Sequence, residues 1–109
     1  MFYIKKRMEI SSSHKLDLDY ESKCTQLHGH NWIIDVYCKS EKLNKSGMVI
    51  DFSEIKNRIF KKLDHKYLNE ILEFNTTAEN LAFWIYQQID SCYKVDVRET
   101  NGNTATYEE

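Results

Sequence analysis

The strongest constraint on the fold is a change of hydrophobic period along the chain. Residues 2–10 carry apolar side chains at alternate positions, interrupted only at Lys6, and residues 32–38 alternate in the same way. Alternation with a period of two is typical of a strand that buries one face. We therefore expect two strands before residue 40, each with one apolar face.

Helical spacing replaces the alternation after residue 50. Asp51-x-x-Glu54 and Thr76-x-x-Glu79 both have the form of a capping box, in which side chains accept the free backbone N–H groups at the start of a helix. Apolar residues recur every four positions after each box, as Ile55, Ile59 and Leu63 and as Leu81, Ile85 and Ile89. The pattern predicts two helices that begin at these boxes.

Alternation returns near the C-terminus, where Tyr93, Val95 and Val97 are expected on one face. Asn101-Gly102 has the composition of a hairpin turn and leads to a short final strand near Tyr107. The order β-β-α-α-β-β predicts an α+β fold, with a four-stranded antiparallel sheet and two helices. With 109 residues, we expect residues 1–109 to form a single domain.

Composition excludes several classes of protein. Fifteen basic residues against 17 acidic ones leave a formal net charge of −2, which argues against a general binder of nucleic acids or membrane surfaces. No apolar run is long enough to cross a bilayer, and no N-terminal export signal is present. The three cysteines are odd in number and lack C-x-x-C spacing, so a disulfide framework is not expected. We therefore expect a cytoplasmic protein, with Cys38 and Cys92 in its core.

The histidines suggest a metal site. His28 and His30 share the parity of the apolar face of the second strand, and His14 shares that of the first strand if no bulge intervenes. Two adjacent antiparallel strands would then bring three imidazoles together, a ligand set that zinc uses with an open fourth position. Gly29 would allow the strand to bulge near the metal. The alternative is that each histidine is an ordinary core or surface residue.

Three further positions could carry chemistry. Cys24 lies four residues before His28, and a thiol beside a dication has a lowered pKa. In Asp64-His65, the carboxylate could fix the tautomer of a histidine that moves protons, although a histidine is also common at a helix C-terminus. Glu99 continues the parity of Val97, so it either faces inward to bind an N–H edge of a ligand or is solvated where the strand ends.

Taken together, the motifs resemble those of a known family. They are Ser12-Ser13-His14, Cys24-x-x-Leu27-His28-Gly29-His30, Gly47-Met48-Val49-Ile50-Asp51-Phe52, Leu63-Asp64-His65-x-Tyr67-Leu68-Asn69, Thr77-x-Glu79-Asn80, Glu99-Thr100 and Tyr107. In this order they resemble the 6-pyruvoyltetrahydropterin synthase family over nearly the whole chain. The bacterial branch that makes 6-carboxytetrahydropterin for queuosine biosynthesis is the most similar.

The resemblance implies a fold, an assembly and a set of site residues. The fold would be the tunnelling fold (T-fold), and subunits would form trimers that pair as homohexamers with active sites at subunit interfaces. Zn²⁺ would be held by His14, His28 and His30. The catalytic residues would be Cys24, Asp64 and His65, Glu99 would bind the pterin ring, and Thr77 would lie in the segment that lines the pterin pocket.

The resemblance also implies a reaction. The substrate would be 7,8-dihydroneopterin triphosphate, and the products of the queuosine branch would be 6-carboxytetrahydropterin, acetaldehyde and triphosphate. One alternative is the biopterin branch, in which the carbon–carbon bond stays intact and 6-pyruvoyltetrahydropterin forms. Another is a zinc- and pterin-binding module of the same fold without catalysis.

Overall fold

The computed structural model describes all 109 residues and contains one antiparallel sheet with helices packed against it. The strands are β1 (Phe2–His14), β2 (His28–Ser40), β3 (Cys92–Thr100) and β4 (Asn103–Glu108), and they lie in the order β1-β2-β3-β4. The helices are α1 (Phe52–Leu63), α2 (Leu68–Ile71) and α3 (Ala78–Gln87), with a short 3₁₀ turn at Lys23–Thr25. The predicted α+β order is confirmed, with the single-turn α2 as an addition.

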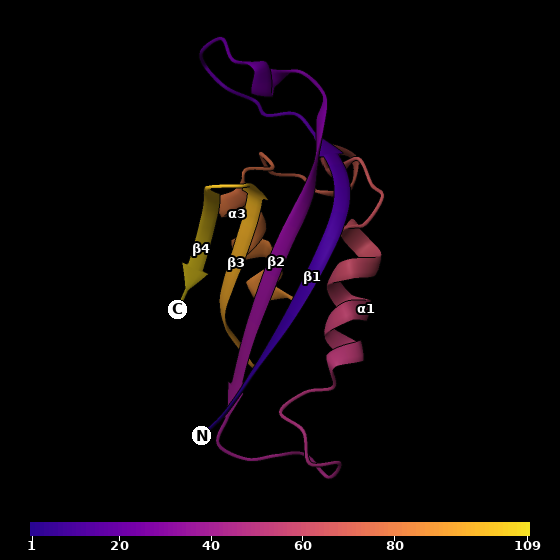
Figure 1. Ribbon diagram of the computed structural model, residues 1–109, viewed down its shortest axis with the longest axis vertical. Helices are drawn as coiled ribbons and strands as arrows, with labels where there is room; N and C mark the ends of the chain where they lie inside the picture. The colour runs from indigo at the N-terminus through magenta and orange to yellow at the C-terminus, as the bar shows by residue number, and fades with distance from the viewer.

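The core lies between one face of the sheet and the helices. Figure 1 shows α1 beside β1 and α3 behind β3, and α3 also contacts β4. The helical stripes predicted from the spacing face this core, since Ile55, Ile59 and Leu63 are fully buried. Cys38 and Cys92 are also buried, as expected. No helix is long and apolar enough to cross a membrane.

The pairing of β1 with β2 is regular along its whole length. It runs without a break from Phe2 opposite Ser40 to His14 opposite His28. The bulge expected at Gly29 is therefore absent, and that interpretation is wrong: Gly29 pairs with Ser13 on the face opposite the histidines. A Cβ at Gly29 would meet only the Ser12 carbonyl oxygen, at 3.8 Å, so the strand has room for a side chain there.

Two local predictions need correction. The N-cap of α3 is Thr77, whose hydroxyl accepts the Asn80 N–H at 3.1 Å, and not Thr76, which is fully buried and contacts His14. Tyr93 does not share a face with Val95. The register between β2 and β3 shifts at Tyr37 and Cys38, and the Tyr93 ring consequently lies 6.3 Å from that of Tyr37 on the outer face of the sheet.

Candidate metal centre and active site

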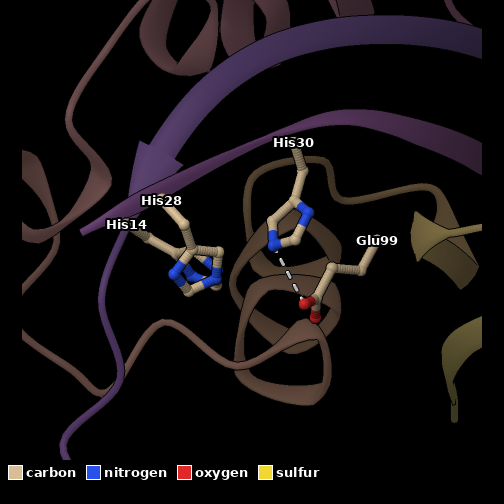
Figure 2. Close-up of side chains that lie close together, drawn as sticks. All are labelled: His14, His28, His30 and Glu99. Atoms are coloured by element: carbon tan, nitrogen blue, oxygen red, sulfur yellow. Dashed lines mark ion pairs between the residues drawn. The ribbon is translucent and has the colours of Figure 1, made fainter. Parts of the chain in front are cut away.

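Three histidines meet at the end of the β1–β2 pair. The regular register places His14 opposite His28, with His30 two residues further along β2 on the same face. The ring centroids are 4.5 Å apart for His14 and His28, 5.0 Å for His14 and His30 and 4.8 Å for His28 and His30. One potential ligand atom from each histidine, and one from Glu99, lie within 4.8 Å of one another (Figure 2).

Backbone carbonyls orient two of the rings. His14 Nδ1 lies 2.9 Å from the Thr76 carbonyl oxygen, and His28 Nδ1 lies 2.7 Å from that of Gln26. A carbonyl only accepts hydrogen bonds, so Nδ1 carries the proton in both rings and Nε2 keeps its lone pair. Metal-ligating histidines are commonly oriented in this way.

Two of the ring nitrogens make no hydrogen bond within the protein. His14 Nε2 and His30 Nε2 are both buried, and neither makes a hydrogen bond. Burying a polar atom without a partner costs free energy, and each case therefore calls for an explanation. A cation among the three rings would satisfy both atoms, so the donor set fits a metal ion that prefers imidazole nitrogen.

Glu99 lies beside the three histidines and is the fourth potential ligand of the cluster. Its Oε1 lies 3.0 Å from His30 Nε2, within the distance of an ion pair (Figure 2). The two atoms do not form a hydrogen bond. The parity of β3 brings Glu99 to the inner face, and the carboxylate is only 22% exposed. Of the two interpretations left open by the sequence, the structure supports the inward one.

Burial favours the neutral form of two of the three histidines, His14 and His30. The pKa of His14 is lowered to about 4, mainly by burial and to a smaller extent by the neighbouring rings of His28 and His30, against the opposing effect of the Thr76 backbone contact. The pKa of His30 is also lowered, mainly by burial, although Glu99 opposes the shift. Neutral imidazoles are the form that binds metals.

The metal-free protein should lose stability as the pH falls from about 6.5 to about 4. An unfolded histidine titrates near 6.5 and folded His14 near 4, so within this range the unfolded chain binds a proton that the folded chain does not. The full loss from His14, reached below pH 4, is on the order of 3 kcal/mol. Urea unfolding across this range measures it, and the His14→Gln variant should lose this part of the pH dependence. Equal pH dependence in both proteins would contradict the assignment.

Asp64 and His65 form the second predicted pair, and they touch each other directly. Asp64 Oδ2 accepts from His65 Nδ1 at 2.7 Å, while Asp64 Oδ1 accepts the Ser11 N–H at 2.9 Å. The Ser11 N–H is the main reason that the pKa of Asp64 is lowered, and His65 adds to it. The carboxylate therefore stays ionised and fixes the imidazole with Nε2 free to accept a proton.

The backbone around this pair is fixed against the free edge of β1. The His65 N–H donates to the Ser11 carbonyl at 2.7 Å, the Ser13 N–H donates to the Lys66 carbonyl at 3.0 Å, and the buried Ser12 hydroxyl donates to the Leu63 carbonyl. His65 has a φ of 55°, in the left-handed region that non-glycine residues rarely adopt. Such backbone strain is concentrated at functional sites.

The His65 side chain is exposed and lies outside the histidine cluster. It is 81% exposed and lines an open hollow of about 550 Å³ with Ser11, Ser13 and Asn31, a hollow that His30 also lines. These three residues alternate with the inward-facing positions of β1 and β2. A single chain therefore does not bring Asp64 and His65 to the metal cluster.

Cys24 lies outside the histidine cluster as well. It is a partly buried free thiol in the 3₁₀ turn, within the loop that joins β1 to β2 and projects beyond the sheet (Figure 1). The thiol makes no hydrogen bond to the histidine cluster, to Asp64 or to His65. Within one chain, the structure thus unites the three histidines and Glu99, and separately Asp64 and His65.

Thr77 occupies the start of α3, next to a second hollow. Its hydroxyl is used as the helix cap, as described above. A hollow of about 380 Å³ lies beside it, lined by Ala78, Glu79, Glu99, Gly102 and the first residues of β4, 103–105. Thr77 itself does not line this hollow, whereas Glu99 does.

Sequence reasoning missed the groups that orient the site. The Thr76 and Gln26 carbonyls are backbone groups, which every residue has, so the sequence does not indicate that these two orient the rings. Thr76 does carry one local signal, because a buried polar residue directly before a helix needs a partner. That signal identifies a role for Thr76 but not its partner.

Comparisons with known proteins identify related sequences. The family model described as 6-pyruvoyl tetrahydropterin synthase matches residues 3–109. A 6-carboxy-5,6,7,8-tetrahydropterin synthase from Synechocystis is 34% identical over 98% of this chain and 93% of its own length. A 6-pyruvoyl tetrahydrobiopterin synthase from Dictyostelium discoideum is also 34% identical, over 94% of this chain and 92% of its own.

The same similarity is seen in three dimensions. The structure of Caenorhabditis elegans 6-pyruvoyl tetrahydropterin synthase superimposes with a TM-score of 0.78 at 26% identity, covering 99% of this chain and 95% of that one. The fold is thus the T-fold of those enzymes. From the family match over residues 3–109, the relatives and this structural agreement, it follows that the chain belongs to the 6-pyruvoyl tetrahydropterin synthase family.

Proposed function

We propose that this chain is a zinc-dependent 6-carboxytetrahydropterin synthase, a carbon–carbon lyase of queuosine biosynthesis. It would convert 7,8-dihydroneopterin triphosphate to 6-carboxy-5,6,7,8-tetrahydropterin, acetaldehyde and triphosphate. The observation that carries the proposal is the inward cluster of three histidines beside Glu99, in which two buried ring nitrogens make no hydrogen bond. It occurs in a chain of a family whose relatives are named as pterin synthases.

The metal would be held by His14, His28 and His30. Three imidazoles are a frequent zinc ligand set, and no cysteine joins the cluster to suggest a purely structural site. When bound, zinc supplies Lewis acidity towards oxygen atoms of the substrate side chain. The chain itself contributes rigid imidazoles, each of two held by a backbone carbonyl, on a regular pair of strands.

Glu99 would bind the pterin ring. A carboxylate accepts two parallel N–H bonds from a planar edge such as the 2-amino group and ring N–H of a pterin. The hollow beside Glu99 is next to the metal cluster and would accept a flat ring. Holding the ring there would orient its side chain, and orientation contributes much of an enzyme's rate acceleration. Thr77, immediately before Ala78 of this hollow, would belong to the segment that lines the pterin pocket.

Cys24, Asp64 and His65 would move protons on and off the side-chain carbons of the substrate. Their separation within one chain supports an active site shared between subunits, because a neighbouring copy can supply what one chain lacks. We propose a homohexamer built as a dimer of trimers, with the ionised Asp64 keeping His65 ready to accept a proton. All three cysteines are free thiols, which suits a reducing cytoplasm.

The carboxy-forming branch is favoured by the form Cys24-x-x-Leu27-His28-Gly29-His30 and by the run Leu63–Glu70, which look most like those of the bacterial enzymes. The alternative within the family is formation of 6-pyruvoyltetrahydropterin, which has the same site and eliminates triphosphate without carbon–carbon cleavage. A binding module without catalysis would have no need for Cys24, Asp64 and His65 together.

Mass spectrometry of the products distinguishes these functions. Incubation of the zinc-loaded protein with 7,8-dihydroneopterin triphosphate should yield 6-carboxytetrahydropterin and one equivalent of acetaldehyde. A pyruvoyl product without acetaldehyde would move the enzyme to the biopterin branch. No product from protein that retains zinc would favour the binding module.

A further inference from the structure

The loop that carries Cys24 has few attachments to the rest of the protein. Residues 15–27 leave the sheet at His14 and return to it at His28, and they extend beyond the sheet in Figure 1. The 3₁₀ turn within the loop is stabilised locally, since the Ser22 hydroxyl caps it. Local bonds give the turn its shape, but they do not hold it against the sheet or the helices.

Two asparagine side chains attach this loop to the helical layer. Asn69 in α2 accepts the Lys15 N–H at 2.9 Å and donates to the Lys15 carbonyl at 2.9 Å. Asn75, just before α3, accepts the Asp17 N–H at 2.9 Å and donates to the Asp17 carbonyl at 3.0 Å. Each amide thus satisfies both backbone groups of one residue, as a neighbouring strand would do.

The backbone of Cys24 is hydrogen-bonded to the other edge of residues 15–17. The Leu16 N–H, between the two residues held by asparagine, donates to the Cys24 carbonyl at 2.7 Å. Residues of an extended chain direct their backbone groups to alternate sides, so Lys15 and Asp17 face the helices while Leu16 faces Cys24. Apart from the contact of Gln26 with His28 at the end of the loop, the four amide bonds are the only hydrogen bonds from residues 15–27 to the rest of the chain.

Asn75 is itself fixed by the start of α3. Its carbonyl accepts from Asn80 Nδ2 at 2.9 Å and from the Thr77 N–H at 2.9 Å. Thr77 caps α3, and the preceding Thr76 contacts His14. One rigid segment therefore touches both the metal cluster and, through Asn75, the loop that carries Cys24.

We propose that Asn69 and Asn75 are positioning residues that set the place of Cys24 relative to the metal cluster. They act through the backbone of residues 15–17 and touch no reacting atom. The inference rests on the proposed catalytic role of Cys24 for its effect on turnover, but not for its effect on the loop. The two amides together form a clamp on the Cys24 loop.

The test is the Asn69→Ala/Asn75→Ala double variant, with Asn57→Ala as its control. Asn57 is exposed on α1 and its side chain makes no hydrogen bond. In the double variant, hydrogen exchange measured by mass spectrometry should show faster exchange in residues 15–27, with the sheet unchanged. The kcat should fall on the order of 10- to 100-fold, with KM and zinc content nearly unchanged, as expected for a displaced catalytic group.

Reactivity of the thiol provides a readout that does not depend on turnover. Cys38 and Cys92 are buried, so iodoacetamide should label mainly Cys24, and its labelling rate should change at least about threefold in the double variant. Asn69→Asp keeps the acceptor for the Lys15 N–H but loses the donor, so its effect on exchange should be intermediate. This milder variant remains informative if the double variant does not fold.

Failure of the clamp and failure of the proposed function are distinguishable. Unchanged exchange in residues 15–27 would overturn the clamp, as would faster exchange with unchanged labelling of Cys24. If the unaltered protein turns over no pterin triphosphate, the proposed function fails, while exchange and labelling still decide whether the clamp exists. If it turns over substrate and the double variant keeps its kcat, the positioning role is overturned.

Discussion

The His28→Ala variant should lose its bound metal and its turnover together. His28 supplies one of three imidazoles, and its ring is already oriented by the Gln26 carbonyl at 2.7 Å, so no other side chain replaces it. Loss of a group that merely orients a ligand reduces metal affinity about 10- to 100-fold, and loss of the ligand itself should cost more. Metal analysis after gel filtration should find about one zinc per subunit in the unaltered protein and almost none in the variant.

The matched control for this variant is His65→Ala. His65 is also a histidine near the sheet, but it is 81% exposed and is not one of the potential metal ligands. Its removal should therefore leave the zinc content unchanged. Full zinc occupancy in His28→Ala would show that the ligand set is wrong, while loss of zinc in both variants would indicate a general loss of structure. Circular dichroism would detect such a loss of structure directly.

The hydrophobic period predicted the architecture because strand alternation and helical stripes are both local properties of the sequence. Strand alternation depends on neighbouring residues and helical stripes on residues four positions apart, so both can be found in one sequence. The same reasoning aligned the three histidines on one face, and the regular register between His14 and His28 bears out that alignment. Glu99 was found by parity too, because β3 continues without a face change from Val95 to Glu99.

The errors occurred where a distant partner overrides local preference. Thr76 is of a residue type that often caps helices, yet it is fully buried and contacts His14. Thr77 caps the helix instead. Tyr93 continues an alternating pattern, yet a register shift opposite Tyr37 and Cys38 moves it to the outer face. Neither the partner of a buried hydroxyl nor the position of a bulge is contained in local periodicity.

The largest gap concerns the loops. Asn69 and Asn75 are ordinary residues in sequence, and nothing in their spacing indicates that both bond to the backbone near residue 16. Hydrogen bonds of this kind connect positions more than 50 residues apart and repeat no pattern. The resemblance to a family could name Asn69 as part of a motif, but only the structure suggests what its side chain does.

The Cys24→Ala variant should retain zinc and lose turnover. Cys24 is not one of the potential ligands of the histidine cluster, so the ligand set remains complete. Removing a positioned group that transfers protons reduces a rate by about 10²- to 10⁴-fold, and kcat should therefore fall within this range. Steady-state kinetics and metal analysis of the same preparation measure both quantities, and Cys24→Ser tests whether a less acidic hydroxyl restores part of the rate.

Lys23→Ala is the matched control, because Lys23 is exposed in the same 3₁₀ turn and its side chain makes no hydrogen bond. It should leave both zinc and kcat unchanged. Turnover that survives in Cys24→Ala would exclude Cys24 as the base, and the proton transfers would then fall to Asp64 and His65. Loss of zinc along with turnover would instead make Cys24 part of the metal site, which the absence of Cys24 from the group of potential ligands argues against. Zinc retained with turnover lost is the result that assigns separate roles to the loop and to the histidine cluster.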